Sequence, residues 1–454
     1  MRDLRFAALI TCLLLSVNAG GVHAQTETAE TADSPGETTD VVPRKRARNV
    51  DLDAPVVDNG SADIEVQLTR SVDSASRNML ETNKQALAEK PDISQMPDTP
   101  GEPIVLLDTE VSAGTAARLA WDTGAFEAVS APTPILVVNG VNPGPTLCLT
   151  AAVHGDELNG IEIVRRVMYG LDPKRLTGAV VGVPIVNLIG FKRSSRYLPD
   201  RRDLNRHFPG NPEGSLASRI AHSFFNEVIR HCDVLVDLHT GSFYRTNLPQ
   251  LRADLRNGEV VKIAESFGSH TAIVHSPGAD GTLRRAATEA GIPTVTLEAG
   301  EPMRLQSDEV TEGTRGINTL LNELGMYRGL RVWGNPAPVH YESRWVRADA
   351  GGILFGAVKL GANVERGQLL GTVTDPITNV RVEIRSPFEG TVIGMAVDQV
   401  VLPGFAAFHI GIRTSADNLY EPMVPGNAIP TNNNPENPPP DDYDPDGRDT
   451  IENS

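Results

Sequence analysis

The chain has 454 residues, of which 40% are hydrophobic, 22% charged and 5% aromatic, and this composition is typical of a soluble globular protein. The formal net charge is −17 and the sequence pI is about 5.1, which argues against nucleic acid as a partner because phosphate backbones are bound by basic surfaces. The length allows one large domain with smaller additional segments.

The first 24 residues are expected to be a secretory signal peptide. Two arginines precede an apolar run from Phe6 to Val17, and the segment ends in a small-residue cleavage pattern at Val22 and Ala24. The apolar run is shorter than the roughly 20 residues that a membrane-spanning helix needs, and no later segment is expected to cross a membrane. We therefore expect export across the inner membrane to the periplasm, without stable membrane insertion. A buried helix is the alternative for this segment.

Two further segments have the composition of disordered chain. Residues 25–100 begin with a polar, acidic stretch rich in Thr and Pro, and then carry only weak helical signals. Residues 416–454 are expected to form an acidic tail, because the chain from Glu421 onward has eight acidic residues and one basic residue. The composition of the tail indicates a solvated segment rather than a binding site.

Residues 101–330 have the pattern of one α/β domain. Continuous apolar runs such as "TLCLTAAV", "AVVGVPIVNLIG", "VLVDL" and "TVTL" alternate with amphipathic helical segments. This alternation predicts a mostly parallel mixed sheet that is covered by helices on both faces. In sheets of this kind, ligands bind at the carboxyl ends of the strands.

Residues 331–415, called the β domain below, have a different sequence pattern. Short strand-like runs and glycine turns follow one another without helices, which predicts a small all-β, barrel-sandwich-like domain. The stretches "VERGQLLG" and "SPFEGTVIG" resemble the two halves of a biotinyl or lipoyl carrier. The turn between them, "TDPITNV", lacks the carrier lysine. We therefore expect the β domain to cap a site or to mediate assembly rather than to carry a prosthetic group.

Two cysteines, Cys148 and Cys232, follow the expected cleavage site, and both lie in apolar, strand-like runs. An oxidising compartment permits a disulfide between them, but the sequence does not show whether they meet. Two buried free thiols are the expectation.

Residues that can bind a metal or transfer a proton stand at the ends of three strand-like runs. His154 follows "TLCLTAAV", with Glu157 three residues later, while His239 follows "VLVDL" and Glu298 follows "TVTL". Two histidines and one carboxylate, with water in the fourth position, are the open ligand set of catalytic zinc sites. By chemistry alone, Asp156 could replace Glu157. Each residue taken singly also has a structural explanation, such as a carboxylate that favours the first turn of a helix.

A basic segment lies between these strand ends. Lys192 to Arg206 contains six basic and two acidic residues, although the chain is acidic overall. A solvated loop is the structural explanation. Beside a metal site, however, guanidinium groups bind carboxylates through two hydrogen bonds and polarise a carbonyl oxygen in the transition state.

Taken together, the motifs are more specific than each residue alone. In their order and spacing, the stretches "HGDE", "SRY", "DLNRHFPG", "DLHTG" and "TLEAG" resemble the succinylglutamate desuccinylase/aspartoacylase family of carboxypeptidase A-like zinc hydrolases. The resemblance covers about Pro103 to Tyr327. It continues through the β domain in a secreted subgroup that resembles N-acetyl-diaminobutyrate deacetylases.

The resemblance implies a role for each matching residue of the metal centre. It implies that His154, Glu157 and His239 bind one zinc ion per chain. It implies that Glu298 takes the proton of the attacking water and returns it to the leaving amine, and that Arg196 polarises the scissile carbonyl.

The same resemblance implies how a carboxylate of the substrate is bound. Asn205 and Arg206 match the pair that grips it, and Asp203 matches the aspartate behind the first zinc histidine, whose second N–H needs an acceptor. Arg284 or Arg285 could add a second carboxylate contact. A surface position is the alternative for both of these arginines.

Three functional hypotheses follow. The leading one is a zinc-dependent amide hydrolase of the deacylase type, acting on an N-acyl amino acid or a similar small carboxylate. The second keeps this chemistry on peptides, as in a periplasmic metallocarboxypeptidase or amidase that acts on cell-wall peptides. The third is a non-catalytic zinc-bearing binding module, against which Glu298 and Arg196 argue because a binding scaffold needs neither. The expected partner is thus a small anionic substrate or a peptide, and a homo-oligomer is compatible with the sequence.

Overall fold

The structure is a computed structural model that describes residues 101–122, 132–242, 244–268, 271–328, 337–397 and 399–419. The expected signal peptide and the linker of residues 25–100 lie outside the described residues, as does the expected tail beyond Leu419. All described residues belong to one compact unit within residues 72–454. Within them, no helix combines the length and the hydropathy that crossing a bilayer requires.

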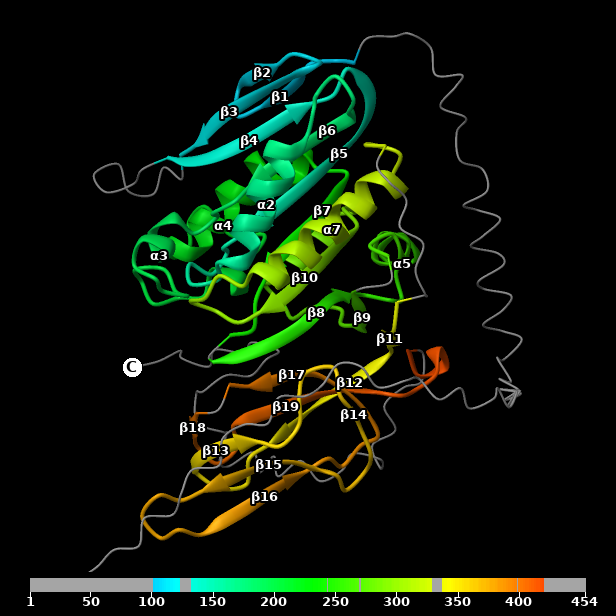
Figure 1. The fold of residues 1–454 in the computed structure, drawn as a ribbon. Helices are drawn as coiled ribbons and strands as arrows, with labels where there is room; N and C mark the ends of the chain where they lie inside the picture. Colours follow the sequence, from blue (N-terminus) through cyan, green and yellow to red (C-terminus); the bar gives the residue numbers. More distant parts are fainter. Residues whose placement is uncertain are drawn as a thin grey trace, which may run out of the picture. The chain divides into compact units, whose positions relative to one another are not determined.

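The core of the structure is a mixed β-sheet (Figure 1). Its central strands β6, β5, β7 and β10 run parallel to one another, whereas β3, β4 and β8 pair antiparallel at the two sides. In spatial order the strands are β3 (Thr115–Trp121), β4 (Thr133–Asn139), β6 (Thr177–Val183), β5 (Asn142–Ala151), β7 (Val234–His239), β10 (Thr294–Gly300) and β8 (Arg245–Ala253).

Helices cover both faces of this sheet, and each face has its own hydrophobic core. On one face the core includes α2, α5 and α7, and on the other it includes α4 and α6. Strand β5 serves both, because Leu147 and Leu149 pack in the first core and Cys148 in the second. The bounds are α2 (Asn159–Gly170), α3 (Leu188–Lys192), α4 (Leu216–Glu227), α5 (Gly258–Glu265), α6 (Leu283–Glu289) and α7 (Ser307–Glu323).

Local sequence explains where several of these helices begin. The side chains of Ser215, Asn257 and Thr282 accept hydrogen bonds from backbone N–H groups in the first turns of α4, α5 and α6. The predicted α/β class, with a mixed sheet flanked by helices, is confirmed.

The β domain adds two sheets to this core. One is β16-β15-β13-β18, and the other is β12-β19-β17 with β14 on its side. Strand β17 also pairs antiparallel with β8, so the second sheet continues the core sheet. The bounds are β12 (Glu342–Arg347), β13 (Gly352–Gly356), β14 (Asn363–Val364), β15 (Leu369–Thr374), β16 (Arg381–Arg385), β17 (Gly390–Ala396), β18 (Val400–Val401) and β19 (Ala406–Ile412).

Short elements complete the described chain. Strands β1 and β2 pair with each other, and β11 pairs with β9, which extends the sheet beside β8. Their bounds are β1 (Ile104–Leu106), β2 (Thr109–Val111), β9 (Ala272–His275), β11 (Val339–His340), and the 3-10 helices η2 (Leu204–Arg206), η3 (Ile229–His231) and η4 (Ala416–Leu419).

The expectation of two free thiols is wrong. Cys148 and Cys232 form a disulfide with a Cα–Cα distance of 5.7 Å, and both residues are buried in the core beneath α4. The two cysteines are 84 positions apart in sequence. They meet because β5 and β7 are parallel neighbours, with Leu147 opposite Val234. That adjacency cannot be read from either cysteine-containing stretch alone.

The disulfide should contribute to stability. Closing a loop of 84 residues restricts the unfolded chain, so the Cys148→Ala/Cys232→Ala double variant should lose about 2–4 kcal/mol of unfolding free energy in denaturant titrations. Reductant should destabilise the native protein to a similar extent and leave the double variant unchanged. Equal stability of the native protein and the double variant would contradict the structural role of the bond.

Candidate active site

The candidate metal ligands come together at the carboxyl ends of two neighbouring strands. His154 follows β5, His239 is the last residue of β7, and Glu157 lies three residues after His154, just before α2. All three side chains are buried. Each offers one ligand atom, and these atoms all lie within 4.8 Å of one another.

Both histidines point the same ring nitrogen at the carboxylate between them. Nδ1 of His154 lies 2.8 Å from Oε1 of Glu157, and Nδ1 of His239 lies 2.9 Å from Oε2. The two Nδ1 atoms are 3.2 Å apart. Ligand atoms around a tetrahedral zinc ion are separated by about 3.3 Å when the metal–ligand bonds are about 2.0–2.1 Å. The spacing of the three side chains therefore fits such an ion after a small expansion.

The outward nitrogens of both rings have carboxylate partners. Nε2 of His154 lies 3.0 Å from Oδ1 of Asp203, and Nε2 of His239 lies 2.8 Å from Oδ2 of Asp237. If each Nε2 carries the proton that its carboxylate accepts, a neutral ring presents the lone pair of Nδ1 to the centre. Two such lone pairs and a carboxylate repel one another unless a cation lies between them. The donor set therefore fits a divalent metal ion.

The electrostatics of the three groups indicate the same charge pattern. Burial alone would raise the pKa of Glu157, yet the adjacent His154 and His239 hold this pKa well below its usual range. Burial would lower the pKa of His239, but Asp237 and Glu157 together raise it well above the usual range. The site thus favours positive charge at the point where the ligand atoms converge, and a metal ion there would supply it.

Asp156 does not join this centre. Among the described residues, the group that could hold a metal contains Glu157 and not Asp156, whose backbone carbonyl accepts a hydrogen bond from Met303. Of the two carboxylates that chemistry allowed, the structure therefore brings Glu157 to the histidines.

Arg196 lies directly behind the centre and is buried. Its Nη1 donates to Glu157 over 3.2 Å and its Nη2 donates to Asp203 over 2.9 Å. Despite burial, Arg196 and His154 hold the pKa of the Asp203 carboxyl well below its usual value. Asp203 thus remains an anion that can accept a hydrogen bond from Nε2 of His154.

Asn205 and Arg206 reach the same cleft from η2. Asp203 begins this turn by accepting a hydrogen bond from the backbone of Asn205 over 2.8 Å, and Oδ1 of Asn205 accepts one from the backbone of Leu283 over 2.8 Å. Gly281 makes the close packing possible, because a Cβ there would lie 2.1 Å from the carbonyl oxygen of Arg206. The loop before α6 is therefore fitted against η2, and both lie at the cleft.

The two arginines in the first turn of α6 have different surroundings. Arg285 is partly exposed, pairs with Asp280 and Glu289, and is not among the residues that line the cleft, so it occupies a surface position. Arg284 is buried, lines the cleft and donates from Nη2 to Ser276 over 3.0 Å. Its Nε and Nη1 have no hydrogen-bond partner among the described residues. Burial, with repulsion from Arg252, lowers the pKa of Arg284 to about 10.

Glu298 lies on β10 opposite His239 of β7 and faces the cleft. Its Oε2 accepts a hydrogen bond from Nδ2 of Asn247 over 3.0 Å, and its Oε1 lies 3.2 Å from Nε of Arg252. Asn247 and Arg252 both belong to β8. The carboxylate is thus held at both oxygens by the strand that joins the core to the β domain.

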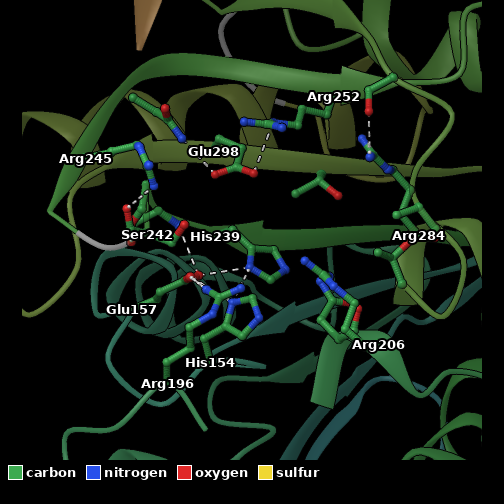
Figure 2. Close-up of a pocket in the computed structure, with 18 of the residues that line it drawn as sticks. His154, Glu157, Arg196, Arg206, His239, Ser242, Arg245, Arg252, Arg284 and Glu298 are labelled. Atoms are coloured by element: carbon green, nitrogen blue, oxygen red, sulfur yellow. Dashed lines mark hydrogen bonds and ion pairs between the residues drawn. The ribbon is translucent and has the colours of Figure 1, made fainter. Parts of the chain in front are cut away.

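These side chains line one cleft. In the view of Figure 2, Arg206 and Arg284 lie to one side of the histidines and Ser242 and Arg245 to the other, with Glu298 and Arg252 across from Glu157. Five arginines and only two carboxylates are among the lining residues, so the cleft favours anions. The arginines are Arg196, Arg206, Arg245, Arg252 and Arg284.

The β domain supplies one wall of the cleft through Trp345 of β12. The guanidinium of Arg245 lies 5.2 Å from the centre of the Trp345 ring and 4.4 Å from that of Phe405. The Trp345 ring also stacks with His409 at a centroid distance of 4.5 Å.

Sequence reasoning missed the residues of β8 that line the cleft, as well as Trp345 and Asp237. A signal existed for Asp237, which precedes His239 by two positions and therefore lies on the same face of the strand. Arg245 and Asn247 show the same spacing in "RTNLPQLRA". Trp345 carried no such signal, because its place at the cleft depends on how the β domain packs.

Comparisons with known proteins agree with these observations. Residues 143–324 match the family model of the succinylglutamate desuccinylase/aspartoacylase catalytic domain. The N-alpha-acetyl-L-2,4-diaminobutyric acid deacetylase of Halomonas elongata is 29% identical over 265 residues, which are 56% of this chain and 77% of that protein.

Solved structures show the same fold. The product-bound ectoine utilization protein EutE (DoeB) from Ruegeria pomeroyi is similar with a TM-score of 0.58 and 25% identity, over 62% of this chain and 90% of that one. A succinylglutamate desuccinylase from Silicibacter sp. TM1040 has a TM-score of 0.59 at 24% identity, over 70% of this chain and 99% of its own, and supports the fold. The resemblance predicted from the motifs is confirmed, because residues 143–324 match the catalytic-domain model of the succinylglutamate desuccinylase/aspartoacylase family and the curated relative is a deacetylase.

Proposed function

We propose that the protein is a zinc-dependent deacylase that hydrolyses the amide bond of an N-acyl amino acid or a similar small carboxylate. One observation carries the proposal. Nδ1 of His154, Nδ1 of His239 and the carboxylate of Glu157 converge within 4.8 Å in a cleft that also contains Glu298 and five arginines. This arrangement combines a metal-ligand set, a proton acceptor and groups that bind anions.

His154, Glu157 and His239 would hold the metal ion. A zinc ion bound by two histidines and one carboxylate activates water near neutral pH and polarises a carbonyl. Asp203 and Asp237 fix the two rings by accepting hydrogen bonds from Nε2–H, which keeps the Nδ1 atoms directed at the centre.

Glu298 is the proposed general base. It accepts the proton of the attacking water and returns that proton to the leaving nitrogen, so the amide bond breaks without releasing an amide anion. Arg252 and Asn247 hold its carboxylate at the cleft over 3.2 Å and 3.0 Å. The proposed role of Arg196 is to polarise the scissile carbonyl, and its hydrogen bonds to Glu157 and Asp203 beside the metal ligands support this role.

The arginines away from the metal ligands support a substrate that carries a carboxylate. Arg206 and Asn205 lie together on η2, and buried Arg284 has two N–H groups without partners among the described residues. Buried N–H donors of this kind gain most from a charged acceptor. A carboxylate of the substrate would provide that acceptor.

The disulfide supports the further proposal that the protein works in the periplasm. A buried bond between Cys148 and Cys232 is typical of proteins that fold in an oxidising compartment. Fractionation of cells that produce the tagged protein tests this proposal, and recovery in the cytosolic fraction with both thiols reduced would contradict it.

The test of function is a mass-spectrometric screen of the zinc-loaded protein. The panel contains N-acetyl and N-succinyl amino acids, among them Nα-acetyl-L-2,4-diaminobutyrate, together with cell-wall peptides. Release of a free amino acid from a panel member supports the proposal. Release of terminal residues from peptides alone would favour a carboxypeptidase, and binding without turnover would favour a zinc-bearing binding module.

Metal content tests the ligand assignment. Elemental analysis should find one zinc ion per chain in the native protein and almost none in the His239→Ala and His154→Ala variants, because two remaining ligands do not hold the ion. His222→Ala is a matched control on α4, and it should keep its zinc. Full zinc content in the His239→Ala variant would contradict the assignment.

Replacing Glu298 tests the general base. Glu298→Gln keeps the size and polarity of the side chain but removes the proton acceptor, so kcat should fall about a hundredfold or more while zinc content and thermal stability stay unchanged. A kcat close to that of the native protein would move the role elsewhere, and Glu301 would be the nearest candidate. Glu301→Gln therefore serves as the control and should retain activity.

Arg206 is the sharpest test of the substrate carboxylate. Arg206→Lys keeps the charge but loses the planar pair of donors, so binding should weaken by about 1.5–3 kcal/mol. A substrate analogue whose carboxylate is amidated should bind the native protein poorly and lose almost nothing more in the variant, since both changes remove one interaction. Simple addition of the two losses would show that Arg206 does not bind this carboxylate.

A further inference from the structure

Strand β8 is shared by the two parts of the structure, and Asn247 lies at the point where they join. On one side Asn247 is opposite Gly300 of β10, and on the other it is opposite Gly394 of β17. The register between β8 and β10 shifts between Glu298 and Gly300. Asn247 is therefore next to the candidate base on one edge and next to the β domain on the other.

The side chain of Asn247 is buried and uses its amide nitrogen on Glu298. Only 3% of the residue is exposed, and Nδ2 donates to Oε2 of Glu298 over 3.0 Å. The amide oxygen could not take this place, because a carboxylate cannot donate to it when ionised. The hydrogen bond therefore specifies one orientation of the Asn247 amide.

The β domain occupies the space on the other side of that amide. A Cβ on Gly394 would lie 2.7 Å from Oδ1 of Asn247 and 3.3 Å from Cβ of His409. A hydrogen at this position lets the backbone of β17 pack directly on the amide. The packing against Gly394 and the hydrogen bond to Glu298 thus hold the two ends of one small side chain.

Two neighbouring residues of β8 fasten the β domain at the same place. Arg245 donates from Nε to the carbonyl oxygen of Ala406 over 2.8 Å, and Gln250 donates from Nε2 to that of Ile393 over 3.0 Å. Both donors are buried, so the loss of either contact would leave a polar group without compensation. The position of β17 against β8 is therefore tightly specified.

We propose that Asn247 is a positioning residue for Glu298 and that the β domain, through Gly394, keeps Asn247 in its working orientation. This inference rests on the proposed role of Glu298 as general base. A base must be oriented toward the proton that it accepts, and each carboxylate oxygen of Glu298 has a contact from β8. The β domain is then part of the catalytic apparatus and not only a wall of the cleft.

Asn247→Leu removes the donor while keeping the shape of the side chain. With the panel member that is hydrolysed fastest, kcat should fall about tenfold to a hundredfold, the scale of one hydrogen bond to a charged group, while KM changes less than twofold. Zinc content and thermal stability should remain those of the native protein. Thr246→Ala, on the neighbouring position of β8 outside the cleft lining, is the matched control and should behave as native.

Asn247→Asp gives a readout that a purely structural role would not produce. It places a second carboxylate beside Glu298, and facing carboxylates disfavour the charged form. The acid limb of the pH profile of kcat/KM should therefore move to higher pH in this variant and stay in place in Thr246→Ala. An unchanged profile, or a loss confined to KM, would overturn the proposal.

Gly394→Ala tests the contribution of the β domain without touching the cleft. The added methyl group should displace the Asn247 amide and lower kcat, as Asn247→Leu does. The kcat of the double variant Gly394→Ala/Asn247→Leu should be only slightly lower than that of either single variant. Gly258→Ala is the control, because a Cβ there meets nothing within 4 Å. Full additivity of the two losses, or a native kcat in Gly394→Ala, would overturn the link to the β domain.

A crystal structure of Asn247→Leu supplies a readout that does not depend on any substrate. The carboxylate of Glu298 should leave its native orientation, and an unchanged orientation would overturn the proposal. Failure of this inference is distinguishable from failure of the proposed function. If Glu298→Gln is inactive while Asn247→Leu is native, only the positioning role is wrong, whereas an active Glu298→Gln overturns both.

Discussion

The structure depends on the close approach of three buried groups that require positive charge. Nδ1 of His154, Nδ1 of His239 and the carboxylate of Glu157 face one another at 2.8–3.2 Å, away from bulk water. Three electron-rich atoms persist at such distances only if positive charge lies between them or on them. The carboxylates of Asp203 and Asp237 lie beside the outward Nε2 atoms of the two rings. When each ring carries its proton on Nε2, its Nδ1 is available for a cation. We regard this constraint as the physical origin of the site.

The parallel sheet brings the three groups together because its neighbouring strands end at the same edge. Neighbouring strands β5 and β7 end at the same edge, which brings residues from distant parts of the chain to one place. Glu298 enters from β10 in register with His239, and β8 then closes the arrangement by holding the Glu298 carboxylate. β8 also pairs with β17 of the β domain. The packing of the β domain and the orientation of the Glu298 carboxylate therefore depend on the same strand. The five arginines of the cleft add an anion-binding surface to an otherwise acidic chain.

The sequence predicted the features that depend on local pattern. Continuous apolar runs identified the parallel strands, and the polar residues at their ends identified the candidate site, while the family resemblance assigned the roles. The sequence did not predict the features that depend on how the elements pack against one another. The disulfide between Cys148 and Cys232 requires the adjacency of β5 and β7. Arg284 and Arg285 are adjacent on α6, and only the orientation of the helix places one of them in the cleft. Asn247 acquires its contacts from two strands that no local stretch of sequence connects.

The most direct test of this account is a crystal structure of the protein purified with zinc, with diffraction data collected on both sides of the zinc absorption edge. We expect one anomalous peak in the cleft, about 2.0–2.2 Å from Nδ1 of His154, Nδ1 of His239 and an oxygen of Glu157. Asp203 and Asp237 should keep their contacts with the two Nε2 atoms. Absence of a peak at these ligand atoms, or a metal ion bound through Asp156 or the Nε2 atoms, would contradict it.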